Sequence, residues 1–305
     1  MIARGVKVLS LFLGYGLVGF GGDYAVGLLA HEAPGDRAVR VRVRPDVKVD
    51  VDVPDVAVRV RMGDQGSCAY EAERKMALGA STSQWLRLQA GSGSLTVEGR
   101  DGLDQVQVVA RACASDEAYL DDLQVTLEAD GGDLALETHY PRRSFGGWGG
   151  HDYARLDLVV LVPRGMPLDV DDSSGEMDLS GTGALRIDDS SGGITIRGAS
   201  GPVSIEDGSG GIDVADVSGD LSIDDGSGGI EVEGVQGDVR LQDGSGSIRV
   251  AAVQHDVVVE NDGSGSIAVR DVQGNFRVAN DGSGSIRYSG VAGRVDIPRD
   301  KRRNR

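Results

Sequence analysis

The amino-acid sequence predicts an all-β fold: a parallel β-solenoid, or β-helix, with about 18 residues per coil, preceded by a non-repetitive β region. Three observations lead to this prediction. The chain holds 47 glycines but only 4% aromatic residues, so frequent turns must interrupt a core of Val, Ile and Leu. Aliphatic and polar residues alternate in short runs, as in strands with one buried face. A Ser-Gly pair recurs at separations of 17 to 19 residues, in Ser174-Gly175, Ser191-Gly192, Ser209-Gly210, Ser227-Gly228, Ser245-Gly246, Ser264-Gly265 and Ser283-Gly284.

Each repeat unit contains two short strands and two turns. The unit that starts at Asp220 places aliphatic residues on both sides of its Asp-Gly-Ser-Gly turn, namely Leu221, Ile223, Ile230, Val232 and Val235. The next units repeat these five columns, which is expected when identical coils stack about 4.8 Å apart. The alternative is an antiparallel sandwich or barrel, because Asp-Gly pairs also close hairpins.

The chain divides into five segments. Residues 1–33 are a signal peptide or an uncleaved N-terminal anchor, because Arg4 and Lys7 precede an apolar run that is short for a membrane span. Residues 34–66 alternate Val with charged residues and form an extended arm. Residues 67–165 form a β-rich N-terminal cap, residues 166–297 form the solenoid, and residues 298–305 are a basic tail. Within the cap we expect one or two helical turns over 116–123, and strands at 85–88, 95–98, 106–112, 123–129, 134–138 and 153–162.

The two cysteines, Cys68 and Cys113, are too few for a disulfide scaffold or a tetrahedral zinc site. If the chain is exported to an oxidising compartment, we expect them to form a disulfide. Closing a loop of this length would stabilise the fold by about 4 kcal/mol in the chain-entropy model. The alternative is two separate buried thiols.

An aspartate column accompanies the Ser-Gly pairs. We consider a calcium ladder along it, because hard oxygen ligands suit calcium. The motif differs from the nonapeptide of calcium-binding β-rolls, and we favour turn chemistry, in which a water-exposed Asp accepts backbone N–H groups two residues on. We therefore commit to no metal and no other cofactor. The column consists of Asp172, Asp189, Asp207, Asp225, Asp243, Asp262 and Asp281.

Charge is unevenly distributed along the solenoid. The net charge of −17 argues against general nucleic-acid binding, which needs a basic surface. Between Gly198 and Asp238 the sequence has acids but no Lys or Arg, whereas arginines recur from Arg240 onward. The acidic band could recruit cations or a basic partner, and the basic end could meet lipid phosphates or acidic glycans. A solvated surface without a partner is the simpler interpretation.

The repeated segments Asp-Gly-Ser-Gly-(Gly/Ser)-Ile-x-Val and Val-x-Gly-Asp-(Val/Leu)-x-Ile, with the apolar run from Leu158 to Leu168, resemble the bacterial "putative adhesin" family of β-strand repeats, a domain of unknown function. The resemblance covers residues 85–297. It implies a β-solenoid that is exported to the periplasm or the cell surface of a bacterium. Cys68 and the segment from Arg111 to Asp116 look like features of exported proteobacterial members.

We expect a binding protein and not an enzyme. The coils are nearly identical, so none stands out as a catalytic site, and the sequence lacks the common hydrolase, zinc-protease and nucleotide-binding motifs. The expected partner is a surface, a glycan or an envelope protein, with Phe145 and Trp148 in the Gly-rich loop 141–151 as candidate ligand contacts. The alternative is a periplasmic scaffold linked to envelope stress. We expect membrane contact only through the N-terminal segment.

Overall fold

The computed structural model describes residues 68–140 and 152–298, and almost all of the regular structure in these ranges is β-strand. The expected arm, the N-terminal segment and all of the basic tail except Pro298 lie outside the described residues. The single helical element among the described residues is the 3₁₀ turn η1 (Glu117–Tyr119), which the side chain of Asp116 caps. The described ranges contain no helix long and apolar enough to span a membrane.

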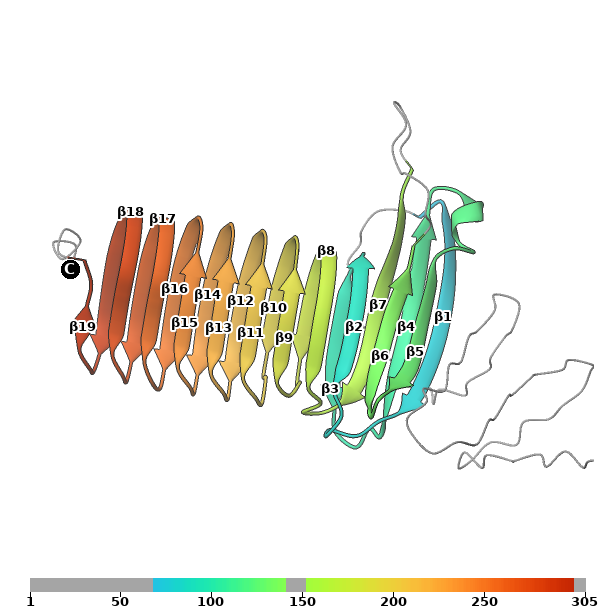
Figure 1. Ribbon diagram of the computed structural model, residues 1–305, viewed down its shortest axis with the longest axis horizontal. Coiled ribbons are helices and arrows are strands. Elements are labelled where there is room, and N and C mark those ends of the chain that lie inside the picture. Colours follow the sequence, from blue (N-terminus) through green and yellow to red (C-terminus); the bar gives the residue numbers. More distant parts are fainter. Residues whose placement is uncertain (1–67, 141–151, 299–305) are drawn as a thin grey trace, which may run out of the picture. The chain divides into compact units, whose positions relative to one another are not determined.

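Residues 168–297 form the expected parallel β-solenoid (Figure 1), so the predicted fold class is confirmed.

Each coil contributes one strand to a first sheet and one to a second sheet. The first sheet contains β9 (Leu185–Asp189), β11 (Val203–Asp207), β13 (Leu221–Asp225) and β15 (Val239–Asp243). The second contains β10 (Gly192–Arg197), β12 (Gly210–Val217), β14 (Gly228–Val235) and β16 (Gly246–Val253). Three longer strands pass through both sheets, β8 (Leu168–Ser180), β17 (Val257–Val272) and β18 (Phe276–Val291), and β19 (Val295–Asp296) ends the first.

The coils stack in register, with equivalent residues directly paired in parallel. Leu221 pairs with Val239, and Ile230 pairs with Ile248. The aliphatic columns face inward as expected, and Leu221, Ile223, Ile230, Val232 and Val235 are all 1% exposed or less. The change from an 18- to a 19-residue period comes from one extra residue near Glu260, because Leu241 pairs with Val259 while Gln242 pairs with Asn261. A one-residue bulge therefore lengthens the coil without disturbing the columns.

The Ser-Gly pairs form one corner of the solenoid, which we call the glycine corner. Gly228 has φ of 156°, a conformation that side chains disfavour. A Cβ atom at Gly228 would overlap the carbonyl oxygen of Gly210 in the preceding coil. Backbone therefore lies directly on backbone at this corner, and no other residue fits there.

The opposite corner is held by exposed polar side chains. The side-chain oxygens of Asp220, Asp238 and Asp256 accept the backbone N–H of the equivalent residue one coil on, at 2.9, 3.0 and 2.7 Å. Asn275 continues the series by accepting from the N–H of Arg294 at 2.8 Å. These bonds tie each coil to the next where no strand pairing exists.

The N-terminal region extends both sheets and then reverses their direction. β2 (Leu86–Ser92) and β3 (Leu95–Arg100) form a coil that pairs in parallel with β8. β6 (Asp133–His139) and β7 (Ala154–Pro163) stack in parallel on that coil. β5 (Gln124–Asp130) and β4 (Gln105–Ala114) then add antiparallel to β6 and β7, and β1 (Tyr70–Gly79) adds antiparallel to β4 (Figure 1). All six expected strands are present, and β1 was not expected.

We predict that Gly228→Ala lowers the free energy of unfolding by about 3–5 kcal/mol, because its Cβ must displace the backbone of the neighbouring coil. Gly229→Ala is the matched control, since a Cβ there meets only atoms 4.0 Å away. It should be neutral or stabilising by about 0.5 kcal/mol. Urea denaturation of the two variants measures the difference, and equal stabilities would contradict the close contact.

Candidate functional site

The seven aspartates of the predicted column stack at the glycine corner, in the order of the coils. Asp207 pairs with Asp225, Asp225 with Asp243, and Asp243 with Asp262. They follow the inward-facing residues of the first sheet, so their side chains also point into the solenoid. Asp225, Asp243 and Asp262 are each 1% exposed, and Asp281 in the last coil is half-buried. The expectation that these carboxylates lie in water is therefore wrong, and even at half-buried Asp281 both carboxylate oxygens are shielded from solvent.

The expected turn chemistry is present within this buried setting. One carboxylate oxygen of each of Asp189, Asp207, Asp225 and Asp243 accepts the backbone N–H of the serine two residues on, at 3.1, 3.1, 2.9 and 2.8 Å. In these four residues the other oxygen is buried and has no hydrogen-bond partner. A buried carboxylate oxygen without a donor is costly when it is charged.

Burial raises the pKa of five aspartates of the column. Loss of hydration is the main cause, and neighbouring aspartates add to it. The pKa of Asp172 rises to about 7, and those of Asp207 and Asp243 rise to about 6. Burial also raises the pKa values of Asp189 and Asp225. Part of the column therefore holds protons near neutral pH, and a protonated carboxyl can donate to the next carboxylate.

Tyr140 closes the N-terminal end of the column. Gly91 of the β2–β3 coil pairs with Asp172, and a Cβ at Gly91 would meet the ring of Tyr140. The Tyr140 hydroxyl lies 2.7 Å from the carbonyl oxygen of Ser92 and accepts the N–H of Ser92 at 2.7 Å. Burial raises the pKa of Tyr140 to about 12, so its hydroxyl stays protonated and donates to Ser92.

A calcium ladder along the column stays a hypothesis. Within the described part of the chain, no three His, Cys, Asp or Glu side chains are grouped so that they could hold a metal ion. Calcium takes six to eight oxygen ligands, whereas the coils of Asp189, Asp207, Asp225 and Asp243 each offer one carboxylate oxygen without a hydrogen-bond partner at this corner. Protonation, which the raised pKa values favour, needs no further ligands and lowers the cost of burying the same oxygens.

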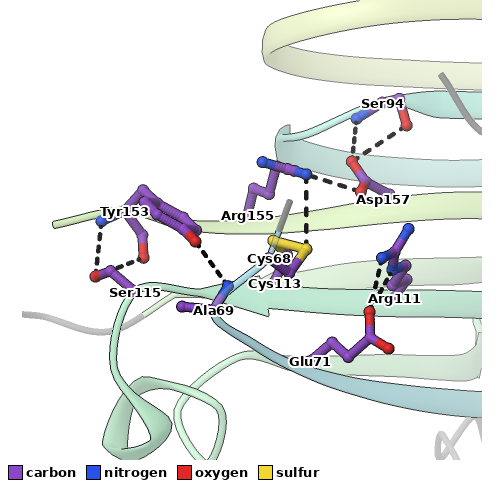
Figure 2. Close-up of a disulfide and its surroundings, with 10 residues drawn as sticks. All are labelled: Cys68, Ala69, Glu71, Ser94, Arg111, Cys113, Ser115, Tyr153, Arg155 and Asp157. Carbon is purple, nitrogen blue, oxygen red and sulfur yellow. Dashed lines mark hydrogen bonds and ion pairs between the residues drawn. A yellow bond between two sulfur atoms is a disulfide. The ribbon is translucent and has the colours of Figure 1, made fainter. Parts of the chain in front are cut away.

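The two cysteines form the disulfide that the sequence predicts, with their Cα atoms 5.5 Å apart. Figure 2 shows the polar side chains around it. Arg155 contacts the sulfur of Cys68 at 3.8 Å and the carboxylate of Asp157 at 3.4 Å. Asp157, which is 4% exposed, also accepts the N–H and the hydroxyl of Ser94. The disulfide is thereby connected to the β2–β3 coil, on which the solenoid stacks.

The other candidate ligand contacts, Phe145 and Trp148, lie outside the described residues. Sequence reasoning missed three features: the exposed series from Asp220 to Asn275, the inward direction of the aspartate column, and the role of Tyr140. The pairs Gly219-Asp220 and Gly237-Asp238 were a signal for the first, because they recur at the second corner of two successive units and are followed there by His255-Asp256 and Gly274-Asn275. The inward direction of the aspartate column also left a signal in the sequence. In Leu221-Ser222-Ile223-Asp224-Asp225 every second residue faces inward, so Asp225 lies on the same face as Leu221 and Ile223.

The outward residues of the second sheet differ from coil to coil, whereas the inward ones repeat. β12 and β14 carry Asp213, Glu231 and Glu233, and the strands from β16 onward carry Arg249, Arg270 and Arg287. All six side chains are exposed. The outer surface is thus the part of the solenoid where the sequence distinguishes one coil from another.

The family model described as Toastrack DUF4097 matches residues 81–292, which run from just before β2 to the end of β18. The chain belongs to the Toastrack DUF4097 family. This Toastrack chain is similar to a solved structure described as a "putative adhesin" from Bacteroides fragilis, at 12% identity over 74% of this chain and 97% of that chain, with a TM-score of 0.38. A "putative adhesin" from Parabacteroides merdae matches at 11% identity over 76% and 97% of the two chains, with a TM-score of 0.35. A "putative cell adhesion protein" from Clostridium sporogenes matches at 11% identity over 74% and 100%, with a TM-score of 0.24. No curated protein matches the chain.

We predict that the aspartate column makes the Toastrack solenoid less stable as the pH rises. Folded-state pKa values near 6 to 7 exceed the value near 4 of an unfolded chain. The folded state then binds more protons, so the column's contribution is fully present below about pH 4 and is lost as the pH rises through 6 to 7. Asp225→Asn keeps the oxygen that accepts from Ser227 and removes the charge. It should stabilise the fold by about 1–3 kcal/mol at pH 8 and flatten the pH dependence.

Thermal unfolding from pH 4 to 8 tests this prediction, with Asp224→Asn as the matched control because Asp224 points outward on the same strand. The prediction fails if Asp225→Asn and Asp224→Asn behave alike. The same variants test the calcium hypothesis, which requires a calcium-dependent rise in Tm that Asp225→Asn diminishes.

We predict that the double substitution Cys68→Ala/Cys113→Ala destabilises the N-terminal region by up to about 4 kcal/mol, because the bridge closes a loop of 45 residues. Hydrogen exchange should increase in peptides from β1 and β4, whereas β13 to β16 should keep their protection. Chemical reduction of the unmodified chain should reproduce the effect. Unchanged exchange in β1 would show that the bridge does not hold this region.

Proposed function

We propose that this chain is an exported, non-enzymatic, adhesin-like protein of the bacterial cell envelope, which binds a surface, a glycan or a protein through the outer faces of its coils. The observation that carries the proposal is that the inward residues of each coil repeat whereas its outward residues vary. The inward columns and corners repeat from coil to coil, while the outward residues of the second sheet change from acids to arginines. Exposed polar and charged residues that vary on a rigid scaffold are suited to recognition.

Two further features support the proposal. The Cys68–Cys113 disulfide fits an oxidising compartment, which a bacterial chain reaches by export. The titratable groups with strongly raised pKa values are spread evenly along the coils and buried behind the turns, whereas a catalytic site gathers such groups at one cleft. This distribution favours a binding role over an enzymatic one.

The proposal predicts that the solenoid is accessible from outside the cell. A tagged chain is produced in a diderm bacterium, and protease is added to intact cells, with a periplasmic protein as the control for envelope integrity. Cleavage of the tagged chain while the control stays intact supports the surface location. Cells with the exposed chain should also adhere more strongly to a glycan-coated surface than cells without it.

Protection until the outer membrane is opened would contradict surface adhesion and favour a periplasmic scaffold. Recovery of the chain with reduced cysteines in the cytosol would contradict export altogether.

A further inference from the structure

A basic patch without carboxylates covers the C-terminal half of the second sheet. It consists of the outward residues of β16 and of the second halves of β17 and β18, and we call it the arginine–serine face. These nine residues are Ser247, Arg249, Ala251, Ser266, Ala268, Arg270, Ser285, Arg287 and Ser289. The equivalent nine positions on β10, β12 and β14 hold three acids and one arginine, namely Gly193, Thr195, Arg197, Gly211, Asp213, Ala215, Gly229, Glu231 and Glu233. The same scaffold therefore carries two surfaces of opposite charge.

Two arginines flank a hollow on this face. Arg249 pairs with Ala268, and Ala268 pairs with Arg287, so the arginines lie two coils apart in one outward column. Strand spacing places their Cα atoms roughly 10 Å apart. The methyl group of Ala268 leaves the space between them open, and the hollow over this region measures about 260 Å³.

The neighbouring column lines the same hollow but carries an ion pair. Arg270 and Glu233 lie 3.6 Å apart across Ala251, which is 5% exposed. By contrast, no carboxylate in residues 68–140 or 152–298 forms an ion pair with Arg249 or Arg287. Arg249 donates to the hydroxyl of Ser247 at 3.4 Å, and Glu231 is its register partner on β14. Both guanidinium groups are exposed and can accept an anionic ligand.

We propose that this hollow binds an acidic polysaccharide that carries one carboxylate per disaccharide, with Arg249 and Arg287 each holding one carboxylate. The proposal rests on the proposed function and names the class of ligand. The arginine separation is comparable to the length of an extended disaccharide unit, so successive carboxylates of such a chain meet successive arginines. The serines beside them offer hydroxyl partners for the sugar.

An acidic peptide fits this spacing less well. Carboxylates on one side of an extended peptide recur about 7 Å apart, and the next repeat falls at about 13 Å. The two acids at the edge of the hollow, Glu231 and Glu233, lie at its β14 end. The polysaccharide therefore follows the column from Arg249 toward Arg287 and beyond, away from these acids.

The test is binding of hyaluronan oligosaccharides to the full, disulfide-bonded chain, measured by calorimetry at low ionic strength. An octasaccharide should bind, and a disaccharide should bind about tenfold more weakly because it reaches one arginine. Neutral oligomers of N-acetylglucosamine should not bind. Raising the salt to about 0.5 M should weaken binding strongly, because exposed charges are screened.

Three variants locate the site. Arg249→Gln/Arg287→Gln should weaken octasaccharide binding about tenfold or more. Arg277→Gln should change it less than about twofold, because Arg277 is an exposed arginine of the same last coil on the first sheet. Glu231→Gln should tighten binding about two- to threefold by removing a repelling charge at the rim. This gain cannot come from unfolding.

The inference is overturned if the unmodified chain does not bind the octasaccharide, if the double variant binds it as well as the unmodified chain, or if poly-L-glutamate binds equally well. If the chain is exposed on cells and promotes adhesion but does not bind hyaluronan, only the proposed ligand class is refuted. A chain that binds hyaluronan but is protected from protease on intact cells would refute only the surface location.

Discussion

Direct contact between backbones at the glycine corner is the constraint on which the rest of the solenoid depends. Because no Cβ fits between Gly210 and Gly228, successive coils can approach only when glycine meets glycine. A slip of one residue would place a side chain in that contact and would also turn every aliphatic residue outward. The register is therefore fixed twice, by steric exclusion at the corner and by the hydrophobic columns between the corners.

The fixed register gives the same residue type opposite properties at two corners. Asp225 stacks inside the solenoid, where loss of hydration raises its pKa. Asp256 lies on the outside, where the backbone N–H and side chain of Asn275 lower its pKa. Hydrogen bonds therefore favour the charged form of Asp256, whereas burial favours the protonated form of Asp225. Neither behaviour follows from amino-acid type alone.

The repeat could be predicted from sequence because both of its determinants are local and periodic. The columns around Leu221 and Ile230 and the Ser-Gly corner each leave a pattern that one sequence displays. β1 was missed because its sequence, rich in Glu, Ala, Lys and Met, has helix-forming residues, and pairing with β4 overrides that preference. The hollow over Ala268 could not be predicted, because it depends on which outward side chains reach one another, and among the described residues only Arg270 forms an ion pair with Glu233 across the coils.

The one-residue bulge near Glu260 shows that the solenoid absorbs length changes inside a coil without altering its columns. Whole coils can therefore be gained or lost by duplication or deletion of a single repeat, each changing the reach of the molecule by about 4.8 Å. Evolution can thus change the distance between the disulfide-bonded region and the arginines of the last coils one coil at a time, without changing the interior of the solenoid.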